Sequence, residues 1–462
     1  MFGCSLGPHF QRPSAPTQAD YLEHAQSLGI TEHSQPSNLR FGQDLPGQWW
    51  ELFHSPSINR LVTHALSHNA DIQAAQQALR VAQENSAAGQ GNWPSLELGF
   101  NPSRTKTSSA MSAVPANNSR YYTLHTAQLN INYVFDMWSA NRRQAESLKA
   151  QAEQQRFVYE ATYLTLTSNV VTAAIQDAAW RSQIALQQRI IQAQQTILTS
   201  SLRQRDLGQL AEIDVFAHAD DLTHSQITLD AMAKSLKQQH DLIAALNGDF
   251  PNQPTPPLTL KGLQLPDDIP VSLPAELTNH RPDMRAAEAN WHAACAQYGL
   301  ALANRFPSLS LSGNVGSSAT ALHQLFTSGQ GIWAIAAQVT QPLFDGGTLR
   351  HRQRAAAAAM AQAAASYRSV VVTAFQNVAD TLHALTLDAQ TLDKNQRALA
   401  RANRSLTISQ HQFAFGDLAN TALQQAIVDQ AQAEMAVIQA QANQLSDTVA
   451  LFQALGGGWW NR

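Results

Sequence analysis

The sequence predicts a mainly helical protein that contains one structural unit twice, with long coiled-coil helices and one β-hairpin in each copy. Three observations support this prediction. Short motifs recur in the same order at a nearly constant spacing, long stretches lack both glycine and proline, and two regions alternate apolar with polar residues. Alternation is typical of β-strands, whereas long runs without helix breakers are typical of helices.

Five landmarks define the internal repeat. They are Asp71–Ala75 with Asp283–Ala287, Trp93–Leu96 with Phe306–Leu309, Phe135–Asp136 with Phe344–Asp345, Leu207–Ala211 with Phe415–Ala419, and Gly248 with Gly456. The spacing within each pair is nearly the same, and the order of the landmarks is kept. A tandem duplication explains five ordered matches better than chance does.

Each copy contains one exceptionally long helix. No glycine or proline occurs between Thr348 and Phe415, and none occurs between Ala116 and Leu207. Apolar residues repeat every seven positions, as in Val371, Val378 and Leu385 of the second copy, which is the spacing of a coiled-coil seam. At about 1.5 Å per residue, such a helix is roughly 100 Å long.

Two shorter helices in each copy match the length of the long one. The return helices, Gln209–Asn247 and Asp417–Leu455, are equally long and are free of glycine and proline. Helices over residues 57–88 and 275–304 precede the hairpins. We expect each of them to stack end to end on its return helix and so to complete the pair with the long helix.

The hairpins are predicted over residues 94–135 and 306–344. Leu96, Leu98 and Phe100 alternate with polar residues, and Ser, Thr, Asn and Gln dominate the opposite positions. Aromatic residues lie near the strand ends: Trp93, Tyr121, Tyr122, Trp138, Phe306, Trp333 and Phe344. This pattern fits membrane-facing strands with an aromatic girdle, and it equally fits a half-buried sheet in a soluble protein.

The amino-acid composition excludes some classes of function. The 462 residues carry a net charge of −4, and only 14% are charged, so a polybasic nucleic-acid binder is excluded. No run of about 18 apolar residues predicts a transmembrane helix.

Four strands per chain leave open sheet edges, and three copies together would give twelve strands, a number found in outer-membrane barrels.

The sequence offers no catalytic constellation. We find no nucleophile elbow, phosphate-binding loop or zinc-type cysteine and histidine spacing, so we predict no catalytic residue, no metal site and no enzymatic activity. His64 and His68 lie four residues apart on a predicted helix and could chelate a metal, but a structural or solvated pair is favoured because no third ligand is near in sequence.

The two cysteines have different contexts. Cys295 lies in an Ala-rich helical stretch and is expected to be a small buried residue. Cys4 follows Gly3 and precedes a Pro-rich polar stretch, which suggests either the attachment point of a lipid or an ordinary exposed thiol. Only three residues precede it, far fewer than a signal peptide contains.

Taken together, the motifs resemble the TolC-like outer-membrane efflux proteins, in particular the lipoprotein branch (NodT/OprM-like) of tripartite efflux systems. The motifs that carry the resemblance are Cys4–Pro8, Gln11–Pro13, Trp49–Phe53, Leu61–Leu66, Asn69–Asp71, Leu273–Leu277, Arg281–Asp283, Ala286–Glu288, Arg305–Leu309, Leu343–Gly347 and Ala454–Trp459. Each motif is weak alone, but the ordered set spans nearly the whole chain.

The resemblance implies a homotrimer whose strands form a twelve-stranded barrel on an α-helical periplasmic tunnel. It implies a passive exit duct for drugs or other small molecules in the Gram-negative outer membrane. The implied partners are a periplasmic adaptor protein, a proton-driven inner-membrane transporter and outer-membrane lipid. No cofactor is expected apart from a covalent lipid on Cys4, the lipidated start of the mature chain.

The predicted organisation has five parts. Residues 1–56 form an N-terminal anchor and equatorial segment, 57–248 the first repeat, 249–274 a Pro-rich equatorial connector, 275–456 the second repeat, and 457–462 a C-terminal tail.

The resemblance also assigns the turns between the long and return helices to the periplasmic tip. The residues expected to dock an adaptor are Leu207, Gly208, Phe415 and Gly416, and the candidate gate residues are Asp214, Asp417, Leu418 and Leu423. The second repeat has Ala422 and Gln425 where some relatives have an acidic pair, so a strongly cation-selective ring is not predicted. An ordinary solvated carboxylate remains an equally good interpretation of Asp214.

Two alternatives to drug efflux remain open. A duct of the same fold could instead serve type I secretion of proteins or peptides, which the partner transporter would decide. A soluble coiled-coil scaffold is an alternative of a different class, and ion conductance in a planar bilayer separates it from a duct.

Overall fold

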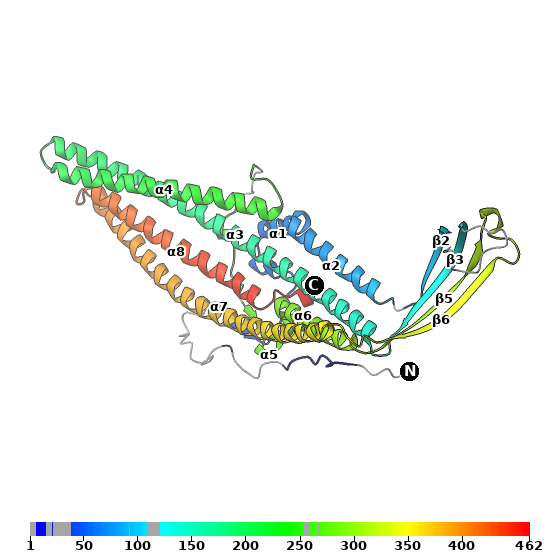
Figure 1. Cartoon of the computed structure of the whole chain (residues 1–462). Helices are drawn as coiled ribbons and strands as arrows, with labels where there is room; N and C mark the ends of the chain where they lie inside the picture. Colours follow the sequence, from blue (N-terminus) through cyan, green and yellow to red (C-terminus); the bar gives the residue numbers. More distant parts are fainter. Residues whose placement is uncertain are drawn as a thin grey trace. The chain divides into compact units, whose positions relative to one another are not determined.

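A computed structural model of the chain describes residues 6–14, 21, 38–91, 93–106, 108, 121–252, 258–266 and 268–462 (Figure 1). The chain divides into two compact units. The sheet unit comprises residues up to 12, 80–154 and 287–367, and the helical unit comprises residues 13–79, 155–286 and 368–462. Each unit contains parts of both sequence repeats. None of the described helices is long and apolar enough to cross a membrane.

The two repeats have the same order of elements. The first contains α1 (Pro56–His68), α2 (Ala70–Gly89), β2 (Ser95–Lys106), β3 (Tyr121–Phe135), α3 (Ala140–Asp206) and α4 (Glu212–Asn247). The second contains α5 (Pro274–His280), α6 (Pro282–Ala303), β5 (Ser308–Ala319), β6 (Gly331–Thr340), α7 (Thr348–Ala414) and α8 (Asn420–Ala454). Both long helices, α3 and α7, have 67 residues, close to the sequence prediction.

The expectation of one continuous short helix in each repeat was wrong, because each is divided in two. Between α1 and α2, Asn69 leaves the helical conformation, and its Oδ1 accepts hydrogen bonds from the backbone N–H groups of Asp71 (2.8 Å) and Ile72 (3.2 Å). This is an N-cap, which starts a new helix. Between α5 and α6, Arg281 precedes Pro282, whose ring disfavours the helical conformation at the residue before it.

Each return helix ends against the break between the two short helices. Gly248, after α4, has φ of 77°, and a Cβ atom there would lie 2.6 Å from the carbonyl oxygen of His68. Gly456, after α8, has φ of 102°, and a Cβ atom there would lie 2.3 Å from the carbonyl oxygen of His280. Only glycine combines this conformation with so close an approach. The return helices thus meet the breaks inside the predicted ranges 57–88 and 275–304, and not the ends of two continuous helices as predicted.

A small parallel sheet was not anticipated from the sequence. Strand β1 (Asn38–Phe41) pairs with β4 (Asp268–Val271), which lies in the predicted Pro-rich connector. The two strands are far apart in the chain, so no local pattern indicates their pairing.

The core of the helical unit joins the N-terminal segment to the long helices. A 3-10 turn at Trp49–Phe53 buries Trp49 and Phe53, and both rings pack against Phe452 of α8, with centroids 5.7 and 6.2 Å away. Ile175 and Ala178 of α3 belong to the same buried cluster. The Trp-Trp-Glu-Leu-Phe motif is therefore a packing element.

Candidate functional site

The sheet unit holds four antiparallel strands in the order β2-β3-β5-β6. Cross-strand neighbours share one face of a sheet. The register places one row of apolar side chains across all four strands: Leu98, Leu129, Val315 and Trp333. The next residues along the strands, such as Asn130 and Asn314, fall on the opposite face, which is rich in Ser, Asn and Gln. The predicted division into an apolar and a polar face is confirmed. The polar face is not free of charge, however, because the register places Glu97 on it, opposite Asn130.

The apolar face is open to its surroundings. The exposed fraction is 80% for Leu98, 75% for Trp333 and 72% for Ile335. Such a continuous exposed apolar surface needs an apolar neighbour. Strands β2 and β6 pair on one side only within the described sheet, so both of its edges are also available for pairing.

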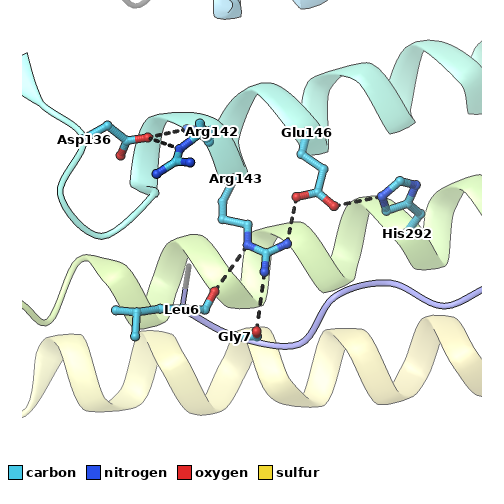
Figure 2. A network of polar contacts seen from close by, with 7 residues as sticks. All are labelled: Leu6, Gly7, Asp136, Arg142, Arg143, Glu146 and His292. Carbon is cyan, nitrogen blue, oxygen red and sulfur yellow. Dashed lines mark hydrogen bonds and ion pairs between the residues drawn. The ribbon is translucent and has the colours of Figure 1, made fainter. Parts of the chain in front are cut away.

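An aspartate begins each long helix where it leaves the sheet. Asp136 accepts hydrogen bonds from the backbone N–H groups of Asn141 (2.9 Å) and Arg142 (3.1 Å), and its ion pair with the Arg142 side chain is seen in Figure 2. Asp345 accepts from Leu349 (2.7 Å) and Gly347 (2.9 Å), and these backbone bonds hold the pKa of Asp345 below its ordinary value. The repeated Phe-Asp landmark thus marks two helix starts.

The first described residues of the chain are bound to α3 (Figure 2). Arg143 donates to the carbonyl oxygens of Leu6 (3.3 Å) and Gly7 (3.4 Å) and forms an ion pair with Glu146 at 2.8 Å. Although burial raises the pKa of Glu146, hydrogen bonds from His292 and Arg143 hold it below its ordinary value overall. Residues 6 and 7 are therefore fixed by a buried arginine.

Two further contacts secure this N-terminal segment. The Phe10 ring stacks on His292, with centroids 4.5 Å apart, and Arg12 forms an ion pair with Glu288 at 3.1 Å. Cys4, the predicted lipidation site, lies outside the described residues. Cys295 is buried as predicted, and this burial raises the pKa of its thiol.

The turns between long and return helices have the same backbone geometry in both repeats. Gly208 has φ of 74° and Gly416 has φ of 82°. In the first turn, Gly208 N–H donates to the carbonyl of Arg205 and the next N–H donates to that of Gln204, each at 2.8 Å. This is a Schellman motif, and the second turn repeats it.

The residues before these glycines protrude. Leu207 is 72% exposed and Phe415 is 81% exposed. The sequence missed a further pair in the first turn of α4, Ile213 and Phe216, with exposed fractions of 71% and 57%. Their spacing of three residues places them on one face of the helix. The tip of the first repeat therefore carries an exposed apolar patch, Leu207, Ile213 and Phe216.

The four candidate gate residues occupy two different environments. Asp214 and Asp417 are exposed. Leu423 is buried against Leu406 and Ala426 between α7 and α8, and Leu418 packs on the same cluster. The carboxylates are thus free to face a passage, whereas Leu423 fills the inside of the helix pair. Their roles in a gate stay predictions.

The histidine pair of α1 is engaged in local contacts. His64 Nε2 lies 3.0 Å from Asp249 Oδ2, and its ring stacks on His68 with centroids 4.2 Å apart. The Nδ1 atom of His68 lies 2.8 Å from Ser67 Oγ. These contacts fit the predicted structural pair.

The fold is that of solved outer-membrane channels. It superposes on the outer-membrane channel OprN with a TM-score of 0.86 at 24% identity, covering 99% of this chain and 100% of that one. It superposes equally well, with a TM-score of 0.86, on the Campylobacter jejuni channel CmeC, at 20% identity over 98% and 95% of the two chains.

The sequence comparison identifies the family. The profile of the family described as outer membrane efflux protein matches residues 61–248 and 273–457, so the chain belongs to this family. The toluene efflux pump outer membrane protein TtgC of Pseudomonas putida is 27% identical over 472 residues, covering 100% of this chain and 94% of its own. The pyoverdine export outer membrane protein OpmQ of the same species is 28% identical over 429 residues, covering 90% and 89%.

Proposed function

We propose that the chain is the passive exit duct of a tripartite efflux pump in the outer membrane. The observation that carries this proposal is the four-stranded sheet. Its exposed apolar face suits lipid, and its opposite face, rich in Ser, Asn and Gln, suits a water-filled passage. Membership of the outer membrane efflux family supports the same conclusion. The duct performs no chemistry, so the driving energy comes from an inner-membrane transporter.

A homotrimer would complete both parts of the duct. Three copies would pair the free edges of β2 and β6 and close twelve strands into a barrel. The helices also present surfaces for a neighbouring copy. Exposed apolar side chains lie on α4, as in Ile227 (60%), and on α7, as in Val372 (69%) and Leu387 (61%). Contact between α4 of one copy and α7 of the next would bury them.

The helical turns are the proposed docking point for a periplasmic adaptor. Leu207 and Phe415 protrude beside glycines that carry no side chain and have no atom within 4 Å of an added Cβ, so the turn backbone is open. For the cargo we propose small organic molecules. This rests on the names of TtgC and OpmQ, whose cargoes, toluene and pyoverdine, differ widely in chemistry. A secretion duct for proteins has less support because neither name indicates a protein cargo.

We further propose that Cys4 carries a covalent lipid. A lipid on Cys4 would lie close in sequence to residues 6–12. Contacts with Arg143 and His292 tie these residues to α3 and α6. Mass spectrometry of the protein from the outer-membrane fraction tests this, with Cys4→Ser as the control. An unmodified Cys4 in the membrane-derived protein would contradict it.

Membrane insertion of the sheet is the decisive test of the duct. Ile335 and Ala336 are neighbours on β6 and face opposite sides of the sheet. Ile335→Lys should cost about 2–4 kcal/mol of insertion energy, because a charge near the bilayer centre is unfavourable. Ala336→Lys, the matched control, should insert normally and shift the conductance of the trimer in a planar bilayer. Equal insertion of both variants, or no conductance by the wild type, would exclude the duct.

The same bilayer measurement tests the gate. Asp214→Asn and Asp417→Asn should each reduce the preference for cations if these carboxylates line the narrowest part. Leu423→Ala should instead lower thermal stability, because Leu423 packs between α7 and α8. Unchanged selectivity in both aspartate variants would remove them from the gate.

A further inference from the structure

We propose that Asp44, Glu276 and His280 form a binding site for a divalent transition-metal ion such as Zn²⁺. One potential ligand atom from each residue lies within 4.8 Å of the other two. All three belong to the helical unit. The site is independent of the proposed export function, which needs no metal.

The imidazole of His280 is held in place by the C-terminal residues. Its ring stacks on Trp460, with centroids 3.7 Å apart and an angle of 8° between the planes. The backbone carbonyl of His280 accepts a hydrogen bond from Trp459 Nε1 at 2.6 Å. A ligand fixed in this way loses little conformational entropy on binding, which favours affinity.

The Nδ1 atom of His280 is buried but has no hydrogen-bond partner among the described residues. The Asp44 Oδ1 atom lies 4.0 Å away, too far for a hydrogen bond. Tetrahedral coordination at about 2.0–2.2 Å places two ligand atoms about 3.3–3.6 Å apart, so a small rotation of the half-exposed Asp44 side chain would let one ion contact both atoms. A metal ion would therefore satisfy a polar atom that the protein leaves unpaired.

The two carboxylates reach the site from separate segments. Glu276 and His280 are four residues apart on α5, so both lie on the same face of that helix. The Glu276 Oε2 atom accepts a hydrogen bond from the backbone N–H of Leu273 at 3.3 Å, which orients the carboxylate and leaves its other oxygen for a metal. Asp44 precedes the buried Leu45, whose carbonyl accepts from Asn461 Nδ2 at 2.9 Å.

The donor set selects the class of ion. One imidazole nitrogen with two carboxylates suits Zn²⁺ and similar first-row ions, and the two negative charges balance the ion. Asp44 is half exposed, with 53% of its side-chain surface accessible, so water can complete the coordination. The ion would join residue 44 to α5 beneath the C-terminal tryptophans, and so stabilise the folded state.

Zinc binding to the full-length trimer tests the proposal. After treatment with EDTA and its removal by dialysis, the protein is titrated with ZnCl₂ in detergent by isothermal calorimetry, and its thermal midpoint is followed in parallel. We expect one Zn²⁺ per chain and a higher midpoint with zinc. His280→Ala and Asp44→Asn should each weaken binding about tenfold or more.

Two controls keep this experiment decisive. His64→Ala removes a histidine of the α1 pair and should leave zinc affinity unchanged. Asp44→Asn alters a half-exposed residue. Unchanged migration of this variant protein as a trimer would exclude a folding defect. The absence of stoichiometric binding by the wild type would overturn the proposal. Equal affinity of wild type, His280→Ala and Asp44→Asn would also overturn it, as would loss of binding in His64→Ala.

Discussion

The two repeats share their backbone geometry but differ in how their return helices are covered. Helix α8 buries side chains along its whole length, because it packs against α3 through Val428 and Ala431 and against α7 through Leu423. Helix α4 buries side chains only near its two ends and leaves Ile213 and Ile227 exposed. The duplication thus preserved turns, caps and helix ends, while side chains diverged according to the neighbour that covers each helix.

The interior of the helix pairs shows the same divergence. In the first repeat, the buried Asp177 of α3 accepts from Arg181 Nε at 2.7 Å, and His240 Nε2 of α4 lies 2.7 Å from its other oxygen. Helix α3 is related to α7, and α4 to α8, by an offset of 208 residues. The positions equivalent to Asp177 and His240 are therefore Leu385 and Thr448, which carry no charge. The following variants test this difference between repeats.

The largest effect is expected at Asp177. Asp177→Ala should lower the free energy of unfolding by about 3–5 kcal/mol, because it leaves Arg181 without its buried carboxylate. Chemical denaturation followed by circular dichroism measures this loss. The control in the second repeat is Thr448→Ala, at the position equivalent to His240, where one buried hydrogen bond is lost at a cost of about 1 kcal/mol. Equal losses in the two repeats would contradict the assignment.

The next effect concerns the glycines that end the return helices. Gly456→Ala should cost about 2–3 kcal/mol, because a Cβ would lie 2.3 Å from the His280 carbonyl oxygen and φ is positive. Gly248→Ala should cost slightly less at a 2.6 Å approach. Gly329 also has a positive φ, but no atom lies within 4 Å of an added Cβ. Gly329→Ala therefore measures the cost of the backbone conformation alone, about 1 kcal/mol of the free energy of unfolding. A loss at Gly456 no larger than at Gly329 would contradict the steric explanation.

A carboxyl pair gives the second repeat a dependence on pH. Burial and the nearby charge of Asp447 raise the pKa of Asp388 to about 7. Because this value exceeds that of an unfolded aspartate, the folded state is favoured at low pH, and stability falls as pH rises from about 4 through 7. Asp388→Asn should therefore stabilise the protein by about 1 kcal/mol at pH 8 once solvent screening is considered. No change should appear at pH 4, and a pH-independent effect in the thermal midpoint would contradict this explanation.

The smallest effect should be equal in the two repeats. Gly208→Ala and Gly416→Ala should each cost about 1 kcal/mol, because both turns have positive φ and no atom lies within 4 Å of the added Cβ. Unequal thermal midpoints of the two variants would show that the turns are not equivalent.

Patterns that act over short distances were predictable from the sequence. The period-2 alternation around Leu98 predicted the face of the sheet, and the absence of glycine and proline predicted the length of α7. Glycines at 208 and 416 indicated the turns, because a positive φ is inexpensive only for glycine. The helix break at Asn69 was missed because its capping bonds are too local to alter the hydrophobic pattern. The break at Arg281 was missed although Pro282 marks it in the sequence.

By itself, the sequence determined the duplication, the long helices, the two hairpins and the family resemblance, because each depends on periodicity or on residues with restricted backbone conformations. Only the tertiary structure decided that β1 pairs with β4, that Leu423 is buried, and that Asp44 meets Glu276 and His280. These are contacts between residues distant in the chain, or depend on which neighbour covers a helix. The free energy of these contacts arises from packing and from paired polar atoms, and no local pattern of residues predicts it.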